Sequence, residues 1–351
     1  MVFGGLYTEE ESPCTGRKLE KLKKFLSQAG LSYDETIEYT VLVTDEEGEI
    51  RACGSAAGNV LKCIAVSEDL RGEGLTATLV SNLVRYETER GITHLFLFTK
   101  PENKAMFTDL GFYEIVCTDT VLFMENKRDG IAAYVESIAA ETKARLDDLR
   151  TELPGLPAEP VYGAIVANCD PFTKGHRYLI EEALRQCDLL HLFVLSEDRS
   201  YFSAKDRYEM VKAGTADLHR VLLHPTSDYL ISAATFPTYF IKNTEKAVIA
   251  NTELDVRIFG KCIAKPLGIK KRFAGTEPAD AVTNAYNETM RRILPEYGVE
   301  FIEICRLSEE KTPVSAKNAR KALAEQDRET LEKLLPGTTV TYLKEKAGCI
   351  F

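Results

Sequence analysis

A short polar segment that follows an apolar run carries the residues best suited to chemistry in this sequence. The run is Val161–Ala167, and the segment after it reads Asn-Cys-Asp-Pro-Phe-Thr-Lys-Gly-His over 168–176. This pattern predicts a strand that ends in a tight turn, with a helix that begins near Gly175. The first backbone N–H groups of a helix have no partner within the helix, and the helix dipole adds positive potential there. The segment therefore predicts a site for an anion, and a polyphosphate suits it.

Three residues of this segment suit a phosphate group whose phosphorus is under attack. Thr173 supplies a hydroxyl, His176 supplies an imidazole, and Gly175 leaves room for a phosphate to approach the backbone. Donors placed in this way stabilise charge that develops on phosphorus without forming a covalent bond. The same residues also fit an ordinary helix start with Thr173 as the cap, and this motif alone does not separate the two interpretations.

A second segment, near the end of the sequence, favours the phosphate interpretation. Residues 313–320 read Pro-Val-Ser-Ala-Lys-Asn-Ala-Arg, a turn that leads into a helix and carries Ser315 and Arg320. The two segments resemble, in the same order, the two signatures of the nucleotidylyltransferase superfamily. This resemblance implies that Thr173 and His176 contact the phosphates at the attacked centre, while Ser315 and Arg320 hold the phosphates that leave.

Nearly all of residues 160–325 also resembles the citrate lyase ligase family. Besides the two motifs, the segments that carry this resemblance are Phe202–Arg207, Thr235–Lys242, Arg272–Pro278 and Thr283–Asn287. Two positions depart from the pattern that we expect for the family, since Asp170 stands in place of Asn and Lys317 in place of a small hydroxyl residue. A carboxylate at Asp170 would repel phosphate unless it faces Mg²⁺ or Lys174.

The resemblance implies a reaction and the residues that serve it. Acetate and ATP would give acetyl-AMP and pyrophosphate, and Mg²⁺ is expected to bridge the phosphates. The acetyl group would then pass to the thiol of a coenzyme-A-like prosthetic group on the acyl carrier subunit of citrate lyase. The residues expected to act in catalysis are His176, Thr173 and Arg320, and those expected to bind ATP are Asn168, Phe172, Lys174, Gly175, Gly275, Thr276, Glu277 and Ser315.

Two other functions stay open at this point. A nucleotidyltransferase would adenylate a phosphorylated small molecule and would need a second basic pocket for the phosphate of that acceptor. A carrier-protein binding module would use the same phosphate pockets without turnover. Stoichiometric release of AMP would argue against the first alternative, and the absence of ATP turnover with any carboxylate would favour the second.

Another glycine-rich turn lies in the N-terminal third of the chain. Residues Val66–Thr76 join an apolar strand to a helix, and the N–H groups of such a turn form a nest for a diphosphate. Together with Asn103–Phe112, this turn resembles the GNAT acetyltransferase fold over roughly residues 35–125. The resemblance implies that Arg71, Gly72 and Gly74 bind the diphosphate of the coenzyme-A-like group. Because no catalytic base stands out, we favour a docking module over an independent acetyltransferase.

The elements that must position these motifs divide the chain into three parts. We expect a GNAT-like α+β domain over 1–128, a helical linker over 129–158, and a Rossmann-like, HUP-type nucleotidyltransferase domain over 159–351. In the last part, apolar strands alternate with helical segments, which predicts an α/β fold with a parallel sheet whose ligands bind at the carboxyl ends of the strands. Its expected strands are Val161–Ala167, Leu189–Ser196, Val221–His224, Arg272–Ala274 and Phe301–Ile304. The helices expected between and after them include His176–Arg185, Lys205–Gly214, Ala281–Leu294 and Ala316–Leu323.

Composition restricts the class of protein. A chain of 351 residues suggests two domains, and a net charge of −10 disfavours a nucleic-acid partner. Nine cysteines without a Cys-x-x-Cys pair favour reduced thiols, and we interpret Cys169 as a packing residue and His191 as a core or edge residue of a strand. The first residues lack the pattern of a signal peptide, and no apolar run approaches the ~20 residues of a membrane span. We therefore expect a soluble, cytoplasmic protein without a membrane partner.

Overall fold

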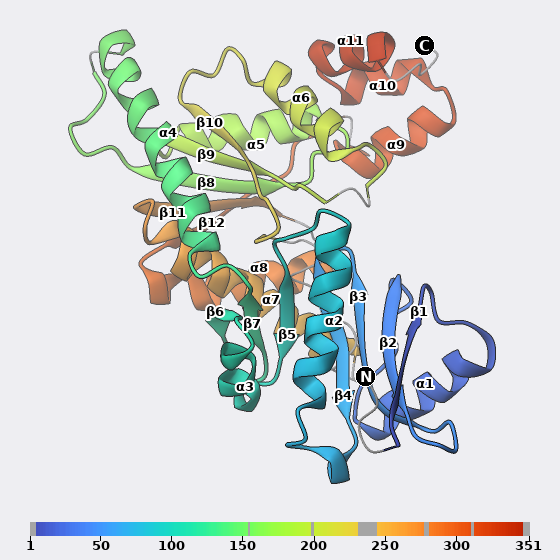
Figure 1. The fold of residues 1–351 in the computed structure, drawn as a ribbon. Helices are drawn as coiled ribbons and strands as arrows, with labels where there is room; N and C mark the ends of the chain where they lie inside the picture. The colour runs from blue at the N-terminus through green and yellow to red at the C-terminus, as the bar shows by residue number, and fades with distance from the viewer. Residues whose placement is uncertain are drawn as a thin grey trace. The chain divides into compact units, whose positions relative to one another are not determined.

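The protein is divided into two compact units. The computed structural model describes residues 5–153, 155–197, 200–230, 244–276, 281–309 and 312–346. One unit comprises Met1–Gly130 and Ala233–Leu254, and the other comprises Ile131–Ser232 and Asp255–Phe351 (Figure 1). The helix that we expected as a linker is α4, Gly130–Glu152, and it belongs almost entirely to the second unit. The domain bounds expected from the sequence stay a prediction.

The first unit is built on a mixed seven-stranded sheet in the order β1-β2-β3-β4-β5-β7-β6. Strands β4 and β5 pair in parallel, and the other neighbours are antiparallel. Helix α2 packs Leu75, Leu79 and Leu83 against the sheet because these apolar residues recur at helical spacing. The strands are β1 Tyr7–Glu11, β2 Tyr39–Thr44, β3 Ile50–Ala57, β4 Val60–Val66, β5 Phe96–Thr99, β6 Tyr113–Cys117 and β7 Leu122–Glu125, and the helices are α1 Gly16–Gln28, α2 Leu75–Glu89 and α3 Lys104–Asp109.

The second unit contains the expected parallel sheet, with five strands in the order β10-β9-β8-β11-β12. The strands are β8 Tyr162–Ala167, β9 Leu189–Val194, β10 Val221–Pro225, β11 Ile269–Gly275 and β12 Glu300–Ile304. The helices that follow α4 are α5 Lys174–Leu184, α6 Ala204–Gly214, α7 Thr244–Ile258, α8 Ala281–Ile293, α9 Ala316–Ala324, α10 Arg328–Leu334 and α11 Gly337–Lys346. The α/β fold predicted for this part of the chain is confirmed.

Strand order places a switch point at β8. From β8 the chain moves outward to β9 and β10, and it then returns to the other side of β8 to form β11 and β12. Loops that leave β8 and β11 therefore diverge at the carboxyl edge of the sheet, which is where ligands of such sheets bind. The segment 168–176 and the turn after Gly275 both begin at this edge.

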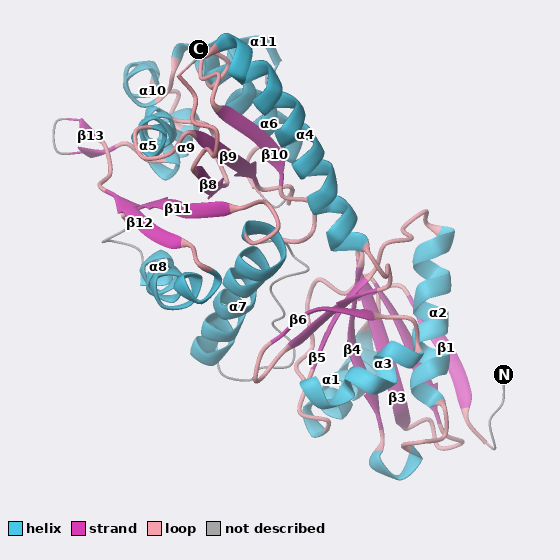
Figure 2. Ribbon diagram, turned by 90° about the vertical axis from the view of Figure 1, so that its left-hand side faces the viewer, coloured by secondary structure: helices cyan, strands magenta, loops and turns pink. Residues whose placement is uncertain are grey.

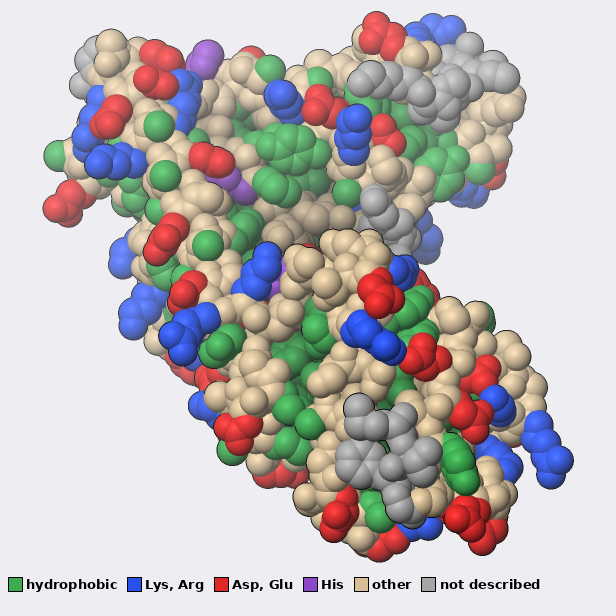
Figure 3. Space-filling view, viewed as in Figure 1, with side chains coloured by type: hydrophobic (Ala, Val, Ile, Leu, Met, Phe, Trp, Pro, Cys, Tyr) green, Lys and Arg blue, Asp and Glu red, His purple; other side chains and the backbone are tan. Residues whose placement is uncertain are grey.

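Helices cover both faces of this sheet. On one face, β8, β9 and β11 share an apolar core with α5, α6 and α9 to α11, and Figure 2 shows α5 beside α9. On the other face, Leu149 of α4 packs against Leu189 and Leu222. No helix in the described ranges has both the length and the apolar content to cross a bilayer. Figure 3 shows acidic and basic side chains interspersed over the visible face of the molecule.

Candidate active site

Thr173 and His176 form a reciprocal cap at the start of α5. The hydroxyl Oγ1 of Thr173 accepts the backbone N–H of His176 at 3.3 Å, and Nδ1 of His176 accepts the backbone N–H of Thr173 at 3.0 Å. Thr173 Oγ1 also lies 3.0 Å from the same Nδ1. The sequence predicted Thr173 either as a cap or as a phosphate ligand, and the structure shows that it is a cap whose partner is the histidine of the motif.

This cap fixes the tautomer of His176. Because Nδ1 accepts the N–H of Thr173, the proton of the neutral imidazole resides on Nε2, at the opposite side of the ring. Burial of the imidazole and the positive charge of Arg306 lower the pKa of His176 to about 4. At neutral pH His176 is therefore an uncharged hydrogen-bond donor whose Nε2–H is held in one direction.

Gly175 joins the first motif to the second. A Cβ at Gly175 would lie 2.7 Å from the backbone oxygen of Val314, so only glycine allows this contact between the start of α5 and the residue before Ser315. Ser315 caps α9 by accepting the N–H of Asn318 at 3.2 Å. The room that the sequence assigned to a phosphate at Gly175 is thus occupied, on the Cβ side, by the second motif.

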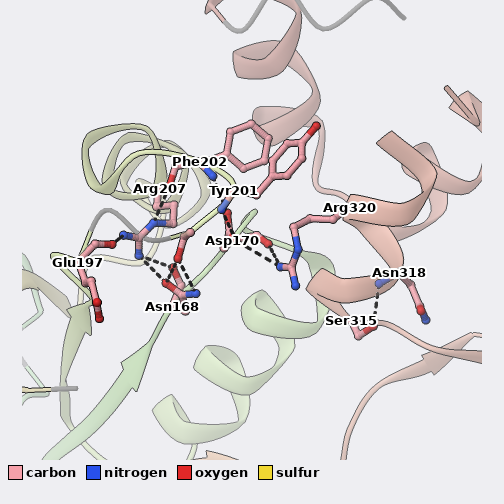
Figure 4. Close-up of polar contacts among 10 residues, drawn as sticks. Asn168, Asp170, Glu197, Tyr201, Phe202, Arg207, Ser315, Asn318 and Arg320 are labelled. Atoms are coloured by element: carbon pink, nitrogen blue, oxygen red, sulfur yellow. Dashed lines mark hydrogen bonds and ion pairs between the residues drawn. The ribbon is translucent and has the colours of Figure 1, made fainter. Parts of the chain in front are cut away.

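Asp170 makes the other connection between the two motifs (Figure 4). Its backbone oxygen accepts a hydrogen bond from Nη1 of Arg320, and its carboxylate lies 3.4 Å from the same nitrogen. The carboxylate also accepts the backbone N–H groups of Tyr201 at 3.0 Å and Phe202 at 2.9 Å. The negative charge of Asp170 is therefore compensated by Arg320 and by two peptide donors, while Lys174 has a different partner, the backbone oxygen of Glu332.

Arg207 holds the same loop from the other side. Its guanidinium is fully buried and donates to the backbone oxygen of Asn168 at 3.1 Å and to the side-chain oxygen of Asn168 at 2.5 Å. It also donates to the backbone oxygens of Phe202, at 3.2 Å, and of Glu197. Asn168 in turn exchanges hydrogen bonds with Ser200. Asn168 and Arg207 are thus residues that shape the loop beside the site.

Two residues expected to bind ATP have other partners. The ring of Phe172 is fully buried, stacks on His176 with 5.9 Å between centroids, and supports the imidazole from the core. The backbone oxygen of Phe172 accepts the hydroxyl of Thr339 of α11 at 3.0 Å. Lys174 donates to the backbone oxygen of Glu332 at 2.9 Å. Neither side chain is directed by these contacts to the phosphate region.

The turn after β11 holds Arg306, a cation that we did not predict from the sequence as a site residue. Thr276 donates its N–H to the backbone oxygen of Ile304 at 3.0 Å, and its Oγ1 accepts the N–H of Arg306 at 3.3 Å. Gly275 faces the side chain of Arg306, whose Cγ and Nε lie 3.9 and 4.0 Å from a Cβ built there. Glu277 lies outside the described residues. Arg306 was missed, although its position two residues after β12, at the ligand-binding edge, was a usable signal.

Cys169 and two histidines are buried without facing this site. Cys169 is 1% exposed, and burial raises the pKa of its thiol to about 12, which agrees with its interpretation as a packing residue. His191, interpreted from the sequence as either a core or an edge residue, is fully buried and has its Nδ1 3.1 Å from Nε2 of His224 on the neighbouring strand. Burial lowers the pKa of His191 to about 3 and that of His224 to about 4, so both are neutral.

The glycine-rich turn of the first unit has the geometry expected of an exposed loop. Gly72 and Gly74 have φ values of 89° and 78°, a conformation that favours glycine, and a Cβ at either position would meet no atom within 4 Å. Gly74 precedes the first turn of α2, whose N-terminus has no side-chain cap. Arg71 is exposed and lies 3.6 Å from Glu68. These three residues stay candidates for a diphosphate site.

Known families match both halves of the chain. Residues 162–343 match the model described as citrate lyase ligase C-terminal domain, and residues 7–114 match the acetyltransferase (GNAT) family. Over 351 residues the chain is 42% identical to citrate (pro-3S)-lyase ligase of Escherichia coli (strain K12), with 98% of this chain and 95% of that protein covered. The ligase of the same name from Haemophilus influenzae (strain ATCC 51907 / DSM 11121 / KW20 / Rd) is 39% identical, with 98% and 99% covered.

A third relative agrees with these two. The ligase of the same name from Klebsiella pneumoniae is 37% identical, with 93% of each chain covered. All three relatives match along almost their whole length, so the likeness extends over both units and both motifs. The chain therefore belongs to the citrate lyase ligase family, with an acetyltransferase-like domain before the ligase domain.

Proposed function

We propose that this protein activates acetate with ATP and transfers the acetyl group to a thiol on the acyl carrier subunit of citrate lyase. In the first step a carboxylate oxygen of acetate bonds to the α-phosphorus of ATP, and pyrophosphate leaves. In the second step the thiol sulfur bonds to the acetyl carbonyl carbon, the bond from that carbon to the AMP oxygen breaks, and AMP leaves. The thiol proton is released to solvent.

The observation that carries this proposal is the meeting of the two motifs at one edge of the sheet. The contact of Gly175 with Val314 and the bonds between Asp170 and Arg320 bring His176 and Arg320 to the same loop, although Asp170 and Arg320 are 150 positions apart. Adenylation needs a carboxylate held in line with the α-phosphorus and a stabilised leaving group, and it needs no protein nucleophile. A hydrogen-bond donor such as His176 and a cation such as Arg320, both held at this loop, suit these two requirements.

Each residue then has a defined task in the proposal. The Nε2–H of His176, fixed by the cap of Thr173, donates to an oxygen of the attacked phosphate. The described bonds of Arg320 use Nη1, and we assign its Nε and Nη2 to the phosphates that leave, together with the N-terminus of α9 behind Ser315. Arg306 supplies a further positive charge from the side of β11 and β12.

Mg²⁺ is the expected companion of the ATP phosphates. Within the described residues there is no group of three or more His, Cys, Asp or Glu side chains able to hold a metal ion. Asp170, the carboxylate of the loop 168–176, accepts two peptide N–H groups and pairs with Arg320. The steps above therefore include no protein ligand to Mg²⁺, which ATP phosphates and water would hold.

In the first unit, the proposal assigns Arg71, Gly72 and Gly74 to the diphosphate of the prosthetic group. The N-terminus of α2, which has no side-chain cap, and the exposed guanidinium of Arg71 support this assignment. We further propose that the GNAT-like domain spans 1–128 and that the ligase domain spans 159–351, with 129–158 between them. A cytoplasmic location agrees with a reaction between ATP and a carrier thiol.

Acetate-dependent exchange of pyrophosphate into ATP is the test of this function. We expect exchange that requires acetate and that is lost in His176→Ala, while His219→Ala retains it because His219 is an exposed histidine outside the two motifs. Melting temperatures of both variants show whether a loss of exchange comes from the missing imidazole or from unfolding of the protein. If the native protein shows no exchange, even with the acyl carrier protein present, the ligase proposal is wrong.

Product analysis separates the ligase from its alternatives. One AMP released for each acetyl-thiol formed supports the ligase, whereas AMP retained on a phosphorylated acceptor supports a nucleotidyltransferase. Binding of the carrier without any ATP turnover supports a binding module.

A further inference from the structure

A cavity of about 300 Å³ opens in the second unit between α6 and the ends of β9 and β10. Four of its lining residues are apolar, and the others bring two hydroxyls and two opposite charges: Val194, Leu195, Ala204 and Pro225, with Ser196, Tyr208, Lys205 and Glu209. Hydrophobic side chains gather in the part of Figure 3 where α6 and β10 lie in Figure 1, with basic side chains at their border. Among the described residues, none that the sequence predicts to bind ATP lines this cavity.

The cavity lies at the same edge of the sheet as the proposed reacting centre. Val194 pairs with Ala167, the residue before Asn168, and the N–H of Leu195 donates to the backbone oxygen of Ala167 at 3.2 Å. Its other wall, α6, carries Arg207, which binds Asn168. The loop 168–176 therefore separates two regions of one edge, with the cavity on the side of β9 and β10 and Arg306 on the side of β11 and β12.

The lining indicates what kind of molecule fits. A cavity of about 300 Å³ is at the small end of ligand pockets, and acetate, with four heavy atoms, would leave most of it empty. Phosphate groups are excluded by apolar walls, because burying an ionised group without compensating partners is costly. One cation, Lys205, is not the basic pocket that a phosphorylated acceptor would require. The composition suits a narrow uncharged chain.

Two hydroxyls give such a chain polar contacts. Ser196 Oγ accepts from Thr226 Oγ1 at 3.4 Å and keeps its own proton to donate, and Tyr208 donates its hydroxyl to the backbone oxygen of Leu223 at 3.3 Å and keeps an acceptor site on its oxygen. An amide group in the chain would use a donor and an acceptor of this kind.

We infer that this cavity receives the thiol-bearing arm of the acyl acceptor, an apolar chain interrupted by amides such as that of pantetheine. The inference rests on the proposed function, because it places the second substrate opposite the nucleotide and directs its thiol to the loop between them. The two substrates then reach the loop 168–176 from different strands of one sheet. The cavity thus selects a carrier thiol for the second half of the reaction.

Filling the cavity tests the inference by direct binding. Ala204→Leu adds three carbon atoms to the wall, and Ala213→Leu makes the same change at an exposed position of the same helix. We expect calorimetry with pantetheine and the full chain to show binding that Ala204→Leu weakens about tenfold or more, and that Ala213→Leu leaves unchanged. The ratio of acetyl-pantetheine formation to pyrophosphate exchange should fall by the same factor in Ala204→Leu alone. Melting temperatures confirm that both variants are folded.

The outcomes separate this inference from the proposed function. Equal binding of pantetheine by both variants, or no binding by the native protein up to millimolar concentration, overturns the inference. A raised KM for acetate in Ala204→Leu, with exchange and transfer reduced together, also overturns it and assigns the cavity to the acyl substrate. Selective loss of pantetheine binding in a protein without exchange would uphold the cavity assignment and reject the proposed ligase reaction.

Discussion

Gly175 gives the sharpest test of how the two motifs are held together. In Gly175→Ala the new Cβ would lie 2.7 Å from Val314 O, so the two atoms must separate by about 0.7 Å to reach an ordinary contact of 3.4 Å. Misplacement of reacting groups by ~1 Å costs on the order of 100-fold in rate. A shift of this size between α5 and the start of α9 therefore predicts that acetate-dependent exchange falls about 10- to 100-fold.

Stability is expected to respond less than activity to this substitution. Overpacking costs about 1–3 kcal/mol, but alanine is favoured over glycine within a helix by about 1 kcal/mol, and Gly175 is the second residue of α5. The net loss in the free energy of unfolding is then about 0–2 kcal/mol, which leaves the protein folded. Acetate-dependent pyrophosphate exchange, and not stability, is therefore the measurement that tests the role of Gly175.

The control for this experiment is Gly337→Ala. Gly337 begins α11, and a Cβ there would meet no atom within 4 Å, so exchange should stay at the native rate. Urea unfolding of both variants reports the stability change separately. Native exchange in Gly175→Ala, at native stability, would refute the argument that this close contact positions the site.

Three further predictions follow from contacts at and near the site. Asp170→Ala leaves the N–H groups of Tyr201 and Phe202 without their acceptor, so urea unfolding should show a loss of about 2 kcal/mol or more; an unchanged free energy of unfolding would contradict this role. Arg306→Met should raise the KM for ATP about tenfold with little change in melting temperature, since an exposed side chain is lost; an unchanged KM would remove Arg306 from the phosphate site. His191 has a folded pKa of about 3, below its ordinary value of 6.5, so the unfolded chain binds its proton first and stability falls as pH drops from 6.5 towards 3. His191→Leu should reduce that slope by up to ~1.4 kcal/mol per pH unit in urea titrations, and a slope equal to the native one would show that this group does not contribute.

Much of the second unit could be predicted because its patterns are local. Strands β8, β9 and most of β10 are apolar runs next to helical segments, and all five expected strands overlap β8 to β12. The N-caps of α5 and α9 could also be predicted, since Thr173 and Ser315 are residue types that commonly start helices. The family assignment followed from these same segments, and it is confirmed.

Strand β3 shows where local patterns fail. Ile50–Ala57 is rich in alanine, glycine and serine, which have weak preference for strands, so its residue pattern did not predict a strand. It is nevertheless a central strand, because its small residues allow α2 to approach: a Cβ at Gly54 would lie 3.1 Å from Leu83 and 3.5 Å from Leu79. Tertiary packing determines this strand.

The contacts of Asp170 and Arg306 could not be predicted either, although the position of Arg306 after β12 indicated that it lies at the ligand-binding edge. Asp170 appeared to be an unfavourable charge near phosphate, because its partners Tyr201, Phe202 and Arg320 are 31 to 150 positions away. Arg306 reaches the site only through the pairing of β11 with β12 and the contact with Thr276. Spacing along one chain does not reveal such contacts.

The bond between Thr339 and Phe172 has a consequence for the order in which the protein is made. The residue that supports His176 is synthesised at the middle of the chain, but the hydroxyl that binds its backbone oxygen comes 167 positions later, on α11. One of the bonds that hold the loop can therefore form only when α11 is present. A chain still under synthesis that ends between Arg320 and Thr339 holds both motifs but lacks the buried hydroxyl beneath the first of them, so this support of the loop is among the last to form.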